Sequence, residues 1–66
     1  MIFLEAWREL KNLTQNKLAT VSGVPQSVIW DIENDPKRMP RIDTLSKIAN
    51  ALNITVDDLL REPEPQ

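Results

Sequence analysis

Apolar residues recur three or four positions apart in five short stretches of the chain, which is the spacing of an α-helix. No stretch alternates apolar and polar residues for long enough to indicate a β-strand. The pattern predicts an all-α domain. The five expected helices cover about residues 3–11, 15–21, 25–34, 41–52 and 55–61.

The apolar positions of these helices form the predicted core. The most amphipathic helix is the fourth, because four of its apolar residues fall on one face. Residues with inward spacing are Leu4, Trp7, Leu10, Leu13, Leu18, Ala19, Ile29, Ile32, Leu45, Ile48, Ala49, Leu52, Val56, Leu59 and Leu60.

Helix boundaries carry local signals. Gly23 is the only glycine of the chain and marks a sharp turn, since glycine takes positive φ without steric cost. Pro25 suits the start of the third helix. Thr55 and Asp58 have the spacing of a capping box. The segment 35–41 holds two prolines and three cations, so we expect an exposed loop.

Composition excludes several kinds of chemistry. The 66 residues include no cysteine and no histidine, which removes disulfides, cysteine-ligated zinc and an imidazole base. Asp57 and Asp58 point about 100° apart on a helix and cannot act as an acid–base pair. We therefore expect no enzyme, metal or cofactor. No apolar run of about 18 residues is present, so we expect a cytoplasmic binding module without a membrane segment.

Charge is distributed unevenly. The chain has eight basic and ten acidic residues, which gives a net charge of −2. Residues 11–41 carry five basic against three acidic residues, whereas residues 42–66 carry two against five. Because exposed charges are screened beyond about 8 Å at physiological salt, a basic middle segment can face a polyanion although the whole chain is acidic.

Two short helices on either side of a glycine turn, at 15–21 and 25–34, indicate a helix-turn-helix, whose second helix enters the DNA major groove. Five strings strengthen this interpretation: LTQNKLA (13–19), SGV (22–24), IxxIEN (29–34), PxxxTLxKIAxAL (40–52) and ITVDDLL (54–60). In this order they resemble the Cro/cI-type, or XRE-type, domain of phage repressors and bacterial regulators. The resemblance covers about residues 4–60 and implies a compact, five-helix, lambda-repressor-like fold.

The resemblance also implies roles for individual residues. Gln15, with Thr14 beside it, would contact a phosphate and brace the reading helix. Gln26 and Ser27 would read base edges, since amide and hydroxyl groups bond to the edges of the base pairs. The positions of Arg8 and Glu33 match a structural pair that ties the first helix to the third.

Helix geometry adds a reading face. With Ile29 and Ile32 inward, Ser27, Trp30, Asp31 and Asn34 fall on the opposite face. The loop cations Lys37, Arg38 and Arg41 would contact phosphates.

Two positions depart from the family pattern. Many relatives have a basic or amide residue where this chain has Asp31, and a small polar residue where it has Trp30. Asp31 would either accept from a cytosine amine or repel phosphate. Trp30 has three possible placements, which are DNA contact, a protein interface and partial burial in the core.

We therefore expect a sequence-specific regulator of transcription, a repressor that binds double-stranded DNA as a homodimer, with half-sites roughly 34 Å apart. The alternative is a protein-interaction module of the antitoxin or antirepressor type that uses the surface around Trp30. The dimer would form through residues 1–3, as an exposed apolar patch, or through the last helix with Leu60. Residues 1–61 would form the domain and 62–66 a flexible tail, while no feature identifies a protein effector.

Overall fold

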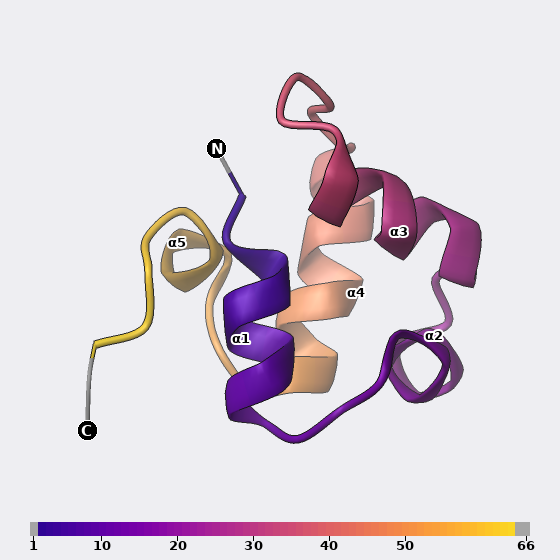
Figure 1. Ribbon diagram of the computed structural model, residues 1–66, viewed down its shortest axis with the longest axis horizontal. Helices are drawn as coiled ribbons and strands as arrows, with labels where there is room; N and C mark the ends of the chain where they lie inside the picture. Colours follow the sequence, from indigo (N-terminus) through magenta and orange to yellow (C-terminus); the bar gives the residue numbers. More distant parts are fainter. Residues whose placement is uncertain (1, 65–66) are drawn as a thin grey trace.

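The computed structural model describes residues 2–64, and within them the chain forms an all-α fold (Figure 1). The helices are α1 (Leu4–Leu10), α2 (Gln15–Ser22), α3 (Gln26–Asn34), α4 (Ile42–Leu52) and α5 (Val56–Leu59). The predicted fold class and the number of helices in this range are confirmed. The fifth helix is shorter than predicted, because it ends at Leu59 and not near Arg61.

The helix boundaries follow the local signals with one exception. Gly23 ends α2 at φ 75° and Asn53 ends α4 at φ 62°, both in the left-handed region that a helix end requires. Pro25 lies just before α3 at φ −55°, ψ 142°, and not inside its first turn as predicted. Its extended ψ directs the chain out of the turn before the helix begins.

A complete capping box starts α5. The Thr55 side chain accepts from the Asp58 backbone N–H, and the Thr55 backbone N–H donates to the Asp58 carboxylate at 2.9 Å. Hydrogen bonds from Thr55, first from its backbone and then from its side chain, lower the pKa of Asp58 below its ordinary value. The charged carboxylate therefore stabilises the start of this short helix.

The core lies where the helices meet around α4. α2 packs against both α3 and α4, α1 packs against α3, and α5 packs against α4. The buried residues are Leu4, Leu18, Val24, Ile29, Ile32, Leu45, Ile48, Ala49, Leu52 and Leu59. Trp7, Leu13, Ala19 and Val56 are partly buried against this cluster, as expected of inward-facing positions.

Three expectations about burial were wrong. Leu10 is 41% exposed, because each three-residue step drifts by about 60° around a helix and turns Leu10 away from the stripe of Leu4. Leu60 is 48% exposed, since it follows the buried Leu59 by one residue and lies beyond the last helical turn. Pro40, within the loop predicted to be exposed, is buried.

The two ends of the described chain pack together. Phe3 N–H donates to the Leu59 carbonyl at 2.8 Å, and the Trp7 indole donates to the carbonyls of Asp58 and Arg61 at 2.8 and 2.9 Å. Ile2 and Phe3 are consequently half-buried, and the predicted exposed patch at residues 1–3 is wrong for these two; Met1 lies outside the described residues. Residues 65–66 of the predicted tail 62–66 also lie outside the described residues.

Over residues 2–64, no helix is long and apolar enough to cross a membrane. The same range contains no group of three or more histidine, cysteine, aspartate or glutamate residues that could hold a metal ion.

Candidate nucleic-acid interface

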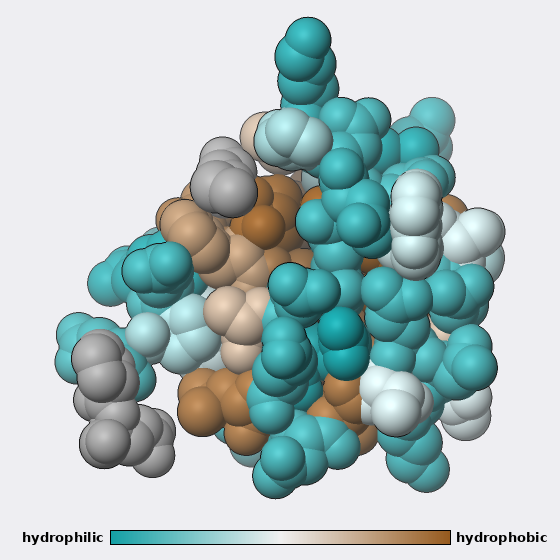
Figure 2. Space-filling view, in the orientation of Figure 1, coloured by the Kyte–Doolittle hydropathy of each residue, from teal (hydrophilic) through white to brown (hydrophobic). Residues whose placement is uncertain are grey.

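α2, the turn at Gly23 and α3 form a compact two-helix unit. Thr14 caps α2 by accepting from the Lys17 backbone N–H at 3.0 Å, which leaves its hydroxyl at the exposed start of that helix. Val24, the residue after Gly23, is buried in the hydrophobic core. The surface over α2 and α3 is mostly hydrophilic, whereas hydrophobic side chains gather towards α1 and α5 (Figure 2).

A nearly buried ion pair joins α1 to α3. Arg8 Nε donates to Glu33 Oε2 at 2.7 Å and Nη2 donates to Oε1 at 3.1 Å, while Nη1 donates to the Leu13 carbonyl at 2.7 Å. The Glu33 side chain is 2% exposed and that of Arg8 12%. Hydrogen bonding to Glu33 raises the pKa of Arg8 above its ordinary value. The structure thus brings together the two residues for which the sequence analysis predicted a structural pair.

The ion pair continues through two glutamine side chains to the surface. Gln15 Nε2 donates to Glu33 Oε1 at 3.0 Å, and Gln26 Nε2 donates to Gln15 Oε1 at 2.7 Å. Gln15 is half-buried, whereas Gln26 is exposed at the first residue of α3. The amide of Gln26 is therefore oriented by a chain of hydrogen bonds that ends on Arg8.

This orientation leaves Gln26 with a defined pair of unused groups. Its carbonyl oxygen can still accept, and the second hydrogen of its amide nitrogen can still donate. An adenine presents the matching pair in the major groove, an N6 donor beside an N7 acceptor.

The exposed face of α3 contains the four residues that helix geometry predicted. Ser27 and Asn34 are exposed, and Asp31 is half-buried. Trp30 is 52% exposed, which excludes its placement in the core. Asn34 turns its amide back along the helix and donates to the Trp30 carbonyl at 2.8 Å.

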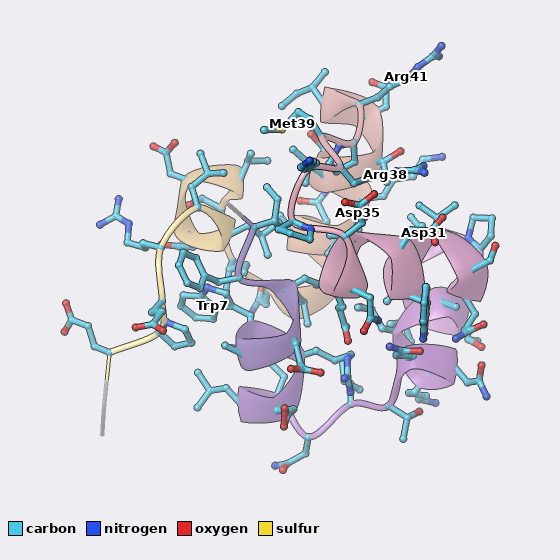
Figure 3. All side chains as sticks on the ribbon, turned by 45° about the horizontal axis from the view of Figure 1, so that its top comes forward. Trp7, Asp31, Asp35, Arg38, Met39 and Arg41 are labelled. Atoms are coloured by element: carbon cyan, nitrogen blue, oxygen red, sulfur yellow. The ribbon has the colours of Figure 1, made fainter. Side chains whose placement is uncertain are left out.

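The loop after α3 supplies the predicted cations. Lys37, Arg38 and Arg41 are all exposed. Arg38 Nη1 lies 3.4 Å from Asp31 Oδ2, so this cation is directed back onto α3. Figure 3 shows these two residues close together with Asp35, whereas Arg41 points away from them.

The sequence analysis expected Gln15 to brace the reading helix, and the structure identifies its partners on α3 as Glu33 and Gln26. The pair of Asp31 with Arg38, which crosses the end of a helix, had no counterpart in the sequence analysis. These pairings depend on how α3 is placed, and no local spacing indicates them.

Comparisons with known proteins agree with this geometry. The helix-turn-helix family profile matches residues 4–59. The transcriptional repressor RghR of Bacillus subtilis is 44% identical over 57 residues, which are 86% of this chain and 42% of RghR. The control protein C.SmaI of Serratia marcescens is 33% identical over 57 residues, which are 86% of this chain and 67% of that protein. The chain thus spans about two fifths of RghR and two thirds of C.SmaI.

Solved structures share the fold. The crystal structure of SinR, a master regulator of biofilm formation, in complex with DNA superposes with a TM-score of 0.81 at 29% identity. The match covers 88% of this chain and 92% of that one. The N-terminal DNA-binding domain of SinR from Bacillus subtilis also gives a TM-score of 0.81 at 29% identity, over 94% of this chain and 90% of that one.

Proposed function

This chain belongs to the helix-turn-helix family, of the Cro/cI or XRE type, and on that premise we propose that it binds double-stranded DNA and regulates transcription. The family consists of transcriptional regulators and not of enzymes. In this proposal α3 enters the major groove and Gln26 reads an adenine. The observation that carries it is the hydrogen-bond chain from Arg8 through Glu33 and Gln15, which holds the Gln26 amide ready for such a contact.

The other proposed DNA contacts are made by exposed residues near Gln26 and in the loop after α3. Ser27 adjoins Gln26 on the reading face, Trp30 packs on sugars or a thymine methyl, and Thr14 lies at the exposed start of α2 near a phosphate. Lys37 and Arg41 contact phosphates from the loop. Both are exposed, and within residues 2–64 neither is paired with a carboxylate.

The regulator acts as a repressor in the cytoplasm, as a homodimer on a symmetric site with half-sites roughly 34 Å apart. The similarity to the repressor RghR supports the assignment as a repressor. Leu60, which directly follows α5, is 48% exposed, and it is the better of the two dimer candidates because Ile2 and Phe3 are half-buried.

Replacing Gln26 with alanine is expected to remove the preference for adenine at one base pair of the half-site, at a cost of about 1–3 kcal/mol in discrimination. The measurement is fluorescence anisotropy with the preferred duplex and with duplexes changed one base pair at a time. Asn50→Ala, which removes an exposed amide from α4, is the matched control and should leave all preferences intact. An unchanged preference at every base pair in Gln26→Ala would remove this residue from the reading face.

Neutralising the loop cations is expected to change salt dependence without changing base preference. A Lys37→Gln, Arg41→Gln double variant should lower the slope of log affinity against log salt by about 2, since each phosphate contact contributes about 0.9. The control is Lys47→Gln, Arg61→Gln, which removes the same charge from α4 and from the segment after α5. Equal slope changes in the two variants would mean that the net charge of the chain matters and the loop does not.

The exposed Trp30 supports one alternative, a protein-interaction module. Trp30 is 52% exposed, and tryptophan is enriched among the residues that contribute most to binding at protein interfaces. A Trp30→Ala variant that loses a protein complex while retaining full DNA affinity would favour this alternative.

A further inference from the structure

The reading face of α3 carries a negative charge, although a surface that approaches DNA normally avoids one. The Asp31 side chain is 44% exposed. Its carboxylate accepts from Arg38 Nη1 at 3.4 Å, and the Arg38 side chain is itself 42% exposed. The loop after α3 therefore supplies the cation that pairs with this carboxylate.

The backbone of the loop places Arg38 at the end of α3. Asp35 N–H donates to the Asp31 carbonyl at 2.8 Å and closes the helix. Asp35 then accepts from two later residues, from Lys37 N–H through its side chain at 3.0 Å and from Arg38 N–H through its carbonyl at 3.1 Å. This turn returns the chain towards α3, so the Arg38 guanidinium extends the exposed face beyond the last helical residue.

The pair with Asp31 leaves the other edge of the guanidinium unused. Only Nη1 donates to Asp31, and within residues 2–64 the Arg38 Nε and Nη2 groups have no hydrogen-bond acceptor. Two parallel N–H donors match the O6 and N7 acceptors of a guanine in the major groove. Lys37, one residue earlier, is exposed and has no carboxylate partner among residues 2–64, which is the arrangement of a simple phosphate contact.

We propose that Arg38 reads a guanine and that Asp31 is the positioning residue that holds its guanidinium for this contact. Asp31 thereby limits the movement of a long cationic side chain that would otherwise reach any nearby phosphate. This proposal rests on the proposed function, because it requires α3 to lie in the major groove. It assigns Arg38 to base recognition, where the sequence analysis predicted a phosphate contact.

The test uses the full chain and its preferred duplex, together with duplexes in which each G·C pair of the half-site is replaced by A·T. Arg38→Ala is expected to reduce the preference for one G·C pair by roughly 5- to 150-fold. Asp31→Asn should reduce the preference for the same pair, and the double variant should lose no more than Arg38→Ala alone. Asp31→Asn should also bind a scrambled duplex more tightly, because a negative charge is removed.

Lys37→Ala is the matched control, and it should weaken binding to all duplexes alike. The proposal is overturned if Arg38→Ala behaves in the same way, or if Asp31→Asn changes a different base pair from Arg38→Ala. A wild-type chain that prefers no duplex over a scrambled one overturns the proposed function as well, and the two failures are thereby distinguished. Circular dichroism melting of each variant excludes unfolding as the cause.

Discussion

Replacing Glu33 with alanine is expected to lower the free energy of unfolding by about 3–5 kcal/mol, the usual cost of leaving one partner of a buried ion pair alone. The Arg8 side chain is 12% exposed, and its guanidinium would lose two hydrogen bonds, while Gln15 would lose its acceptor on α3. Equilibrium unfolding in urea measures the change, provided that the slope with denaturant is unaltered.

The ion pair of Asp31 with Arg38 offers a matched control on the same helix. Both of its side chains are more than two fifths exposed, so Asp31→Ala should cost only about 0–1 kcal/mol. Equal destabilisation by Glu33→Ala and Asp31→Ala would mean that burial does not determine the contribution of these ion pairs to stability. Because Glu33 also anchors Gln15, Glu33→Ala should weaken binding to the preferred duplex even at temperatures where the variant is folded.

Ile48→Ala is expected to cost about 2–5 kcal/mol, since it removes three carbons from a fully buried site and leaves a cavity. Ile48 is 0% exposed on α4, the helix against which α2 and α5 pack. A chain of 66 residues has a total stability on the order of 3–10 kcal/mol, so this one change removes a large part of it. Thermal unfolding followed by circular dichroism measures the loss.

The control for this substitution is Ile42→Ala, at the first residue of the same helix. Ile42 is 64% exposed, so the same three carbons are removed without forming a cavity, and the change should stay within about 0.5 kcal/mol. A loss of similar size at Ile42 and Ile48 would contradict the position of the core.

The sequence predicted those parts of the fold that depend on local spacing and local backbone chemistry. The apolar residues of α4 are buried as their period requires, and Gly23 ends α2 because a positive φ is needed there. The predictions of burial were wrong at the ends of α1 and α5, because these helices are too short for the apolar spacing to hold along their whole length. Leu10 and Leu60 lie at such ends, and there the neighbouring elements decide which residues are covered.

The candidate site could be predicted in part for the same reason. The period of α3 placed Ser27, Trp30 and Asn34 on its exposed face. The bonds that orient Gln26 and Arg38 pass between elements, and they depend on the packing of α2 and α3 and on the turn after α3. A linear pattern contains no information about these distances.

The claim that α3 reads a specific duplex can be tested by selecting bound molecules from a random pool of double-stranded DNA. We expect enrichment of one two-fold symmetric sequence whose half-sites contain an adenine read by Gln26. Binding to that duplex should exceed binding to a scrambled duplex at the same salt concentration by a factor of roughly 10³ or more. If no sequence is enriched, or if the enriched and scrambled duplexes bind equally, the claim is contradicted and the surface around Trp30 serves a protein partner.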